Sequence, residues 1–209
     1  MTSLRRLSSS LASALALSAL AVGVVARGEV IFNTIDPTPP PTVTNDGYVT
    51  MSGANNYWQS QAFTTGGSAT SIDKITFDMQ TAGAAFEIGL YASSGTTPNL
   101  TSLIGSIYSQ GSGGFFSPLV ATFSAINLNA STEYWVVAKR TSGSDLLWGF
   151  TNDLSGLENA YTNDGGSSWT SSTSAPMRMK VEAVPEPPAI VLSGIGLASA
   201  MYAFRRRRG

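Results

Sequence analysis

Apolar and polar residues alternate with a period of two through the middle of this chain. The pattern is clearest in KITFDMQ (74–80), AFEIGLYA (85–92) and MRMKVEAV (177–184). Successive side chains of a strand point to opposite faces, so such alternation is typical of half-buried antiparallel strands. EYWVVAKR (133–140) is almost continuously apolar, which favours a central strand. A first strand is expected over 30–35.

Clusters of turn-forming residues separate these segments. They are NDG (45–47), TGG (65–67), SSG (93–95), GSGG (111–114) and DGG (164–166). No long amphipathic helix interrupts them. Short strands joined by such turns predict an all-β domain, a jelly-roll-like sandwich of two antiparallel sheets.

Composition narrows the chemistry that this domain can perform. The chain has no cysteine and no histidine, which excludes disulfides and Ser-His-Asp catalysis. Five basic and twelve acidic residues lie between Gly28 and Val184, so this segment has a net charge of −7. Nucleic-acid binding depends on Lys and Arg, so we expect no nucleic-acid partner. We also expect no cofactor and no metal site.

The N-terminal segment is typical of a secretory signal peptide. Arg5 and Arg6 precede an uncharged apolar run over 11–25, and Val24 and Ala26 suit the −3 and −1 positions of a cleavage site. The run is short for a membrane span of about 20 residues. We therefore predict a signal peptide over 1–26, cleaved after Ala26, followed by a β-sandwich domain over 27–183.

The C-terminal segment, 184–209, has three parts in a fixed order. The motif Val184-Pro185-Glu186-Pro187 comes first, because proline ends the strand ladder. An uncharged transmembrane helix is predicted over 188–204. The arginine cluster follows it, comprising Arg205, Arg206, Arg207 and Arg208. Such a cluster holds the C-terminus on the cytoplasmic side and stops transfer.

These three parts, in this order, resemble the PEP-CTERM sorting signal of Gram-negative bacteria. The resemblance implies recognition by an exosortase, cleavage near Pro185-Glu186-Pro187, and an inner-membrane-anchored intermediate. It further implies delivery of the body to the cell envelope or extracellular matrix, commonly together with exopolysaccharide. The helix is richer in Gly and Ala than is usual in that family.

The body carries a second resemblance, over about 52–183. NNYWQSQAFTTG, IGLYASSGTTPN, LNASTEYWVVAKR and YTNDGGSSWT follow one another in the order of the choice-of-anchor R domain. That family is a secreted module joined to different surface anchors. The resemblance implies no assigned reaction.

TNDGGSSWT (162–170) is similar to a single Asp-box hairpin. In that pattern Asp164 caps the turn, Gly165 and Gly166 accept positive φ, and Trp169 packs behind the turn. A single copy indicates a well-formed structural hairpin.

Aromatic and amide side chains gather just after the first turns. Trp58 stands beside Asn56, Tyr57 and Gln59, a combination that suits stacking on a pyranose ring and hydrogen bonds to its hydroxyls. These four residues are the candidate glycan contacts. Trp135 lies within an apolar run and is expected in the core.

Acidic residues offer weaker candidates. Asp73, Asp78 and Glu87 fall on strand positions expected to face solvent, where no pair stands out as a glycosidase dyad. The turns Asn152-Asp153 and Asn163-Asp164 lack the spacing of a known calcium loop.

Three functions remain open at this point. The first is a non-catalytic structural or adhesive module of the envelope or matrix. The second is a carbohydrate-binding module for the producer's own exopolysaccharide, and the third is a two-carboxylate glycosidase.

Overall fold

The computed structural model describes residues 29–35, 47–52, 56–111, 113–114, 118–152 and 154–184. Within these ranges the chain is all-β, contains no helix, and pairs its strands in antiparallel fashion. The thirteen strands are β1 (Val30–Asn33), β2 (Gly47–Met51), β3 (Trp58–Thr64), β4 (Thr70–Phe77), β5 (Met79–Thr81), β6 (Ala85–Ser93), β7 (Pro98–Gln110), β8 (Leu119–Leu128), β9 (Glu133–Ser142), β10 (Leu146–Phe150), β11 (Ser155–Thr162), β12 (Thr170–Ser174) and β13 (Met179–Ala183).

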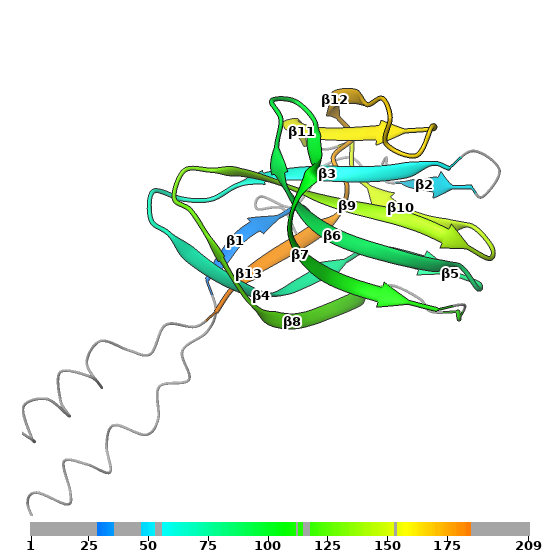
Figure 1. Cartoon of the computed structure of the whole chain (residues 1–209), viewed down its shortest axis with the longest axis horizontal. Helices are drawn as coiled ribbons and strands as arrows, with labels where there is room; N and C mark the ends of the chain where they lie inside the picture. Colours follow the sequence, from blue (N-terminus) through cyan, green and yellow to red (C-terminus); the bar gives the residue numbers. More distant parts are fainter. Residues whose placement is uncertain are drawn as a thin grey trace, which may run out of the picture. The chain divides into compact units, whose positions relative to one another are not determined.

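The strands form three sheets (Figure 1). The largest has the order β12-β11-β3-β9-β6-β7, the second has the order β1-β13-β4-β8, and the smallest has the order β2-β10-β5. Neighbours in each sheet are mostly far apart in sequence. The fold therefore depends on long-range pairing, and local propensity cannot specify it.

Strand β9 lies in the middle of the six-stranded sheet, between β3 and β6, which confirms the prediction for 133–140. Its residues alternate between two buried faces. Val136 and Ala138 enter the main core, whereas Trp135 and Val137 enter a second cluster on the opposite face. A strand that is covered on both faces reads as a continuous apolar run.

The main core takes side chains from all three sheets. Its fully buried large residues include Phe77, Phe86, Leu90, Met179 and Trp148. Phe77 and Trp148 meet edge to face, with ring centroids 5.7 Å apart, an arrangement that aromatic pairs favour. The alternation seen in 85–92 is borne out, because β6 turns Phe86, Ile88 and Leu90 into this core.

The segment 74–80 departs from the sequence prediction. It is two strands rather than one, since β4 ends at Phe77 and β5 begins at Met79 in a different sheet. Asp78, expected to face solvent, is only 7% exposed. The expectation was wrong because the chain passes from one sheet to another at Asp78. The alternation of inward and outward side chains therefore does not continue from β4 into β5.

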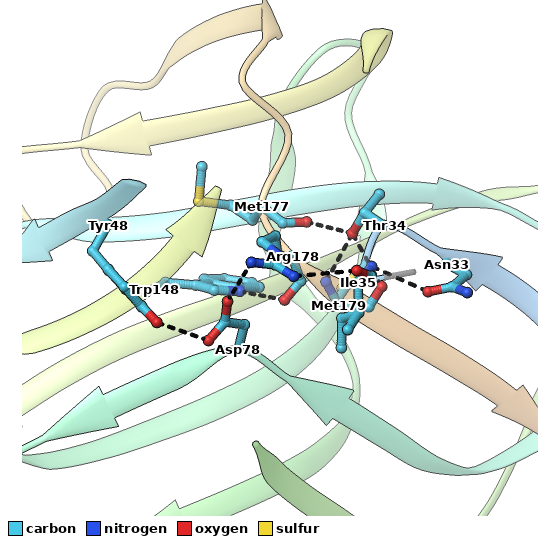
Figure 2. A network of polar contacts seen from close by, with 9 residues as sticks. All are labelled: Asn33, Thr34, Ile35, Tyr48, Asp78, Trp148, Met177, Arg178 and Met179. Carbon is cyan, nitrogen blue, oxygen red and sulfur yellow. Dashed lines mark hydrogen bonds and ion pairs between the residues drawn. The ribbon is translucent and has the colours of Figure 1, made fainter. Parts of the chain in front are cut away.

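A polar network holds this crossing point (Figure 2). The Arg178 guanidinium lies 3.1 Å from Asp78 Oδ2, and the Tyr48 hydroxyl donates to Asp78 Oδ1 at 3.1 Å. The Trp148 indole donates to the Arg178 carbonyl at 3.0 Å. Gly149 makes room for the carboxylate, because a Cβ there would lie 2.5 Å from Asp78 Oδ2.

The last strand starts two residues later than MRMKVEAV suggests. Met177 forms only an isolated bridge with Phe150, and its backbone is bound by side chains instead. The Thr34 hydroxyl donates to the Met177 carbonyl at 2.8 Å, and Gln61 Oε1 accepts from the Met177 N–H at 2.7 Å. These contacts satisfy the buried backbone groups where the ladder stops.

The two ends of the described body lie side by side. β1 pairs with β13, and the Ala183 N–H donates to the Glu29 carbonyl at 2.8 Å. The Val184 N–H donates to the Ser71 carbonyl at 2.7 Å. Ser71 is the second residue of β4. A short loop connects β4 to Thr64, the last residue of β3.

Candidate functional site

The four candidate glycan contacts fall on two faces of the six-stranded sheet. Trp58 and Gln59 are consecutive in β3, so their side chains point in opposite directions. Tyr57 is hydrogen-bonded to Gln59, with its hydroxyl 3.3 Å from Gln59 Oε1. Exposed Asn56 has a φ of 45°, and its carbonyl accepts from the Gly165 N–H at 3.2 Å. The structure therefore does not bring the four side chains together as one platform.

Trp58 lies in an aromatic and cationic cluster on the outer face. The Lys139 ammonium is 4.8 Å from the Trp58 ring centroid and 4.6 Å from that of Tyr91, which is favourable cation–π geometry. It also donates to the Tyr91 hydroxyl at 2.5 Å. A sugar that stacked on this side of Trp58 would have to displace Lys139.

The hairpin over 162–170 packs against the same tryptophan. Gly166 has a φ of 91°, and a Cβ there would lie 2.7 Å from Trp58 Cζ3 and 2.3 Å from Leu100 Cδ1. Trp169 packs instead on the second cluster, which contains Trp135. Trp58 is therefore the ring that this hairpin covers.

Asp164 organises the turn of the hairpin. Its Oδ1 accepts from the Ser168 N–H at 3.0 Å and from the Thr162 hydroxyl at 2.5 Å, and its Oδ2 accepts from the Ser168 hydroxyl at 2.6 Å. The Ser168 and Thr162 hydrogen bonds hold the pKa of Asp164 well below its usual range. Gly165 follows with a φ of 73°. These contacts give Asp164 a structural role in the turn.

On the opposite face of the large sheet, Tyr57, which directly precedes β3, meets Tyr161 of β11. The rings of Tyr57 and Tyr161 are stacked, with centroids 5.6 Å apart and an interplanar angle of 15°. Tyr57 packs against the main core, whereas Tyr161 is 36% exposed. Burial, with a smaller contribution from Tyr161, raises the pKa of Tyr57 to about 12.

Two polar residues flank Tyr161 in its row of the sheet. The register pairs Tyr161 with Gln59 of β3 on one side and with Thr170 of β12 on the other. Directly paired residues share a face, so an amide and a hydroxyl stand next to the exposed ring. Sequence reasoning found Tyr57 and Gln59 but missed Tyr161 and Thr170, because β11 pairs with β3 from about a hundred positions away in the sequence.

The remaining acidic candidates are dispersed. Asp78 is taken up in the ion pair with Arg178, Asp73 is half-buried in β4, and Glu87 is exposed on β6. In the described ranges, no group of three acidic, His or Cys side chains is arranged to hold a metal ion. Asp153 of the Asn152-Asp153 turn lies outside these ranges.

The targeting segments are not described. The predicted signal peptide over 1–26 with Ala26, the residues Pro185, Glu186 and Pro187, the predicted helix over 188–204 and the arginines 205–208 all lie outside the described residues. Among the residues that are described, no helix has the length and apolar character needed to cross a membrane.

No protein-family model and no curated protein matches the chain. A structure of the cysteine protease and lectin-like domains of a surface-layer-associated protein of Clostridium difficile is similar with a TM-score of 0.46 and 11% identity, over 69% of this chain and 37% of that one. A second structure of that clostridial protease has the same TM-score, and this chain spans 41% of its length. A chitosan-binding module from a Paenibacillus chitosanase/glucanase has a TM-score of 0.27 and 18% identity, over 49% of this chain and 90% of the module.

Proposed function

We propose that the protein is exported, held briefly in the inner membrane, and sorted by an exosortase to the envelope or extracellular matrix of a Gram-negative bacterium. The observation that carries this proposal is the order of Val-Pro-Glu-Pro, an uncharged segment and four arginines at 184–208. Val184, the first residue of the motif, is the last residue that the structure describes, and its N–H donates to the Ser71 carbonyl at 2.7 Å.

The sorting motif is tested by replacing Pro185, Glu186 and Pro187 with alanine in the native host. The variant should accumulate unprocessed in the inner membrane, because the exosortase would no longer recognise it. The chain offers a matched control in a second proline-rich stretch, where Pro39, Pro40 and Pro41 are replaced instead. Normal processing of the first variant would contradict the proposal.

For the body, the same proposal assigns a jelly-roll sandwich. The four-stranded sheet has the order β1-β13-β4-β8, and the six-stranded sheet contains the order β3-β9-β6-β7. In both orders, strands from the beginning of the domain lie next to strands from its later part. This is the arrangement of a jelly roll, which is built from two Greek keys. A main core shared by all three sheets also supports it.

We assign this sandwich a non-catalytic structural or adhesive role, associated with exopolysaccharide or biofilm. The support comes from how its acidic residues are used. Asp78 pairs with Arg178 at a sheet crossing, Glu182 pairs with Lys74 at 2.9 Å, and Asp164 fixes a turn. A carboxylate held in such contacts is poorly placed to serve as a glycosidase acid or nucleophile.

Carbohydrate binding is the second candidate function, and the exposed tyrosine pair favours it. Aromatic rings with adjacent amide and hydroxyl groups suit the apolar faces and hydroxyls of a sugar. Retention of the protein on immobilised polysaccharide, without hydrolysis, would support this candidate. Trp58 is an unsuitable probe, because Gly166 and Lys139 pack on its ring.

A further inference from the structure

We propose that Tyr161 and Tyr57, together with Gln59 and Thr170, form a subsite for one uncharged pyranose ring of a polysaccharide. This assignment rests on the carbohydrate-binding candidate above. It moves the contact surface from Trp58 to the opposite face of the same strand.

The tyrosine pair supplies a rigid stacking surface. Tyr57 is anchored on the main core and stacks on Tyr161 with an interplanar angle of only 15°. Tyr161 is thereby held in place although 36% of its surface is exposed. A ring that is already immobilised loses little conformational freedom when a ligand stacks on it.

Gln59 positions the tyrosine pair from inside the sheet. The residue is only 2% exposed, and its Oε1 accepts from the Tyr57 hydroxyl at 3.3 Å. This hydrogen bond holds Tyr57, on which Tyr161 stacks.

Thr170 completes the row from the other side. It pairs with Tyr161 in the register and is exposed. Neighbouring strands lie about 4.8 Å apart, so the exposed Thr170 hydroxyl is within reach of a pyranose that stacks on Tyr161.

The local charge favours a neutral sugar over an acidic one. The row of paired residues consists of Thr170, Tyr161, Gln59 and Ala138, none of which is charged. The Lys139 ammonium lies against Trp58 on the opposite face of the sheet. A uronate or sulfate group would therefore find no cation in this row.

The test uses the full chain in detergent and affinity electrophoresis through gels that contain a neutral β-glucan, soluble chitin or alginate. Tyr161→Ala should weaken retention by a neutral polysaccharide about tenfold, since a stacked ring contributes of the order of one decade in affinity. Gln59→Leu should weaken it as well. Leu103→Ala removes an exposed apolar side chain from β7 and should leave retention unchanged.

The outcomes separate the subsite from the function on which it rests. Retention of the wild type that is lost in Tyr161→Ala but kept in Leu103→Ala supports the subsite. Equal retention of wild type and Tyr161→Ala overturns the subsite and leaves carbohydrate binding in place. Retention by alginate alone overturns the neutral-sugar assignment. A wild type that none of the polysaccharides retards overturns both the subsite and the carbohydrate-binding candidate.

Discussion

Asp78 and Arg178 form a charged pair where the chain passes from the four-stranded to the three-stranded sheet. Two hydrogen bonds extend this ion pair. The Tyr48 hydroxyl donates to the Asp78 carboxylate, and the Arg178 guanidinium donates to the Ile35 carbonyl at 3.2 Å. Three separate segments therefore meet at the Asp78 carboxylate, and Arg178 links a fourth to it. A buried pair of this kind need not stabilise the fold relative to apolar residues, but removal of one partner leaves a buried charge.

Asp78→Ala should therefore be strongly destabilising. We expect the free energy of unfolding to fall by about 3 kcal/mol, because the Arg178 guanidinium and the Tyr48 hydroxyl would lose the buried carboxylate that both bind. Urea denaturation of the purified chain measures this change. Glu87→Ala, at an exposed position of β6, is the control and should change stability by less than about 0.5 kcal/mol. Equal midpoints for the two variants would show that the ion pair does not hold the crossing.

Gly166 provides a second test at this scale. Gly166→Ala should destabilise the protein by about 1–3 kcal/mol, because the residue has a positive φ and its new Cβ would meet Trp58 and Leu100. Gly67→Ala is the matched control, since a Cβ there has no neighbour within 4 Å. Thermal unfolding compares them. A Gly166 variant as stable as the Gly67 variant would contradict the packing of the hairpin on Trp58.

At the scale of elements, the turn between β11 and β12 folds over the outer face of the large sheet, to which both strands belong. The turn is held by Asp164, and its glycines lie against Trp58. Beneath it, Tyr91 and Trp135 form the second cluster. The sheet is consequently buried on both faces near β9. The tyrosine pair lies where β11 pairs with β3.

The charge on Asp164 should link this hairpin to pH. Its pKa is lowered in the folded state, so its contribution to stability is complete above the ordinary carboxyl value and is lost as pH falls toward the folded value. Ser168→Ala removes one of the hydrogen bonds that lower this pKa. NMR titration of the Asp164 carboxyl should then show a higher pKa than in the wild type, whereas an unchanged value would contradict the role assigned to Ser168.

The strands with a clear local hydrophobic pattern could be predicted from sequence, whereas others, such as the long β7 and β8, were not. β6 and β9 follow their patterns closely, and even the division of Tyr57 and Trp58 between two faces follows from a period of two. The partners could not be predicted. Arg178 lies a hundred positions from Asp78, and Tyr161 lies about as far from Tyr57, and no local pattern encodes which strands pair.

At the scale of the whole chain, the two ends of the described body lie side by side. The Ala183 N–H donates to the Glu29 carbonyl at 2.8 Å. In the sequence, the proposed signal peptide precedes Glu29 and the proposed sorting signal follows Ala183.

The most direct test of that account is the mass of the mature protein from its native host, measured together with its cellular fraction. We expect a product that lacks residues 1–26 and the residues after Pro185-Glu186-Pro187, found outside the inner membrane. A product that retains Arg205–Arg208 and stays in the inner membrane would contradict exosortase sorting and indicate a permanent anchor.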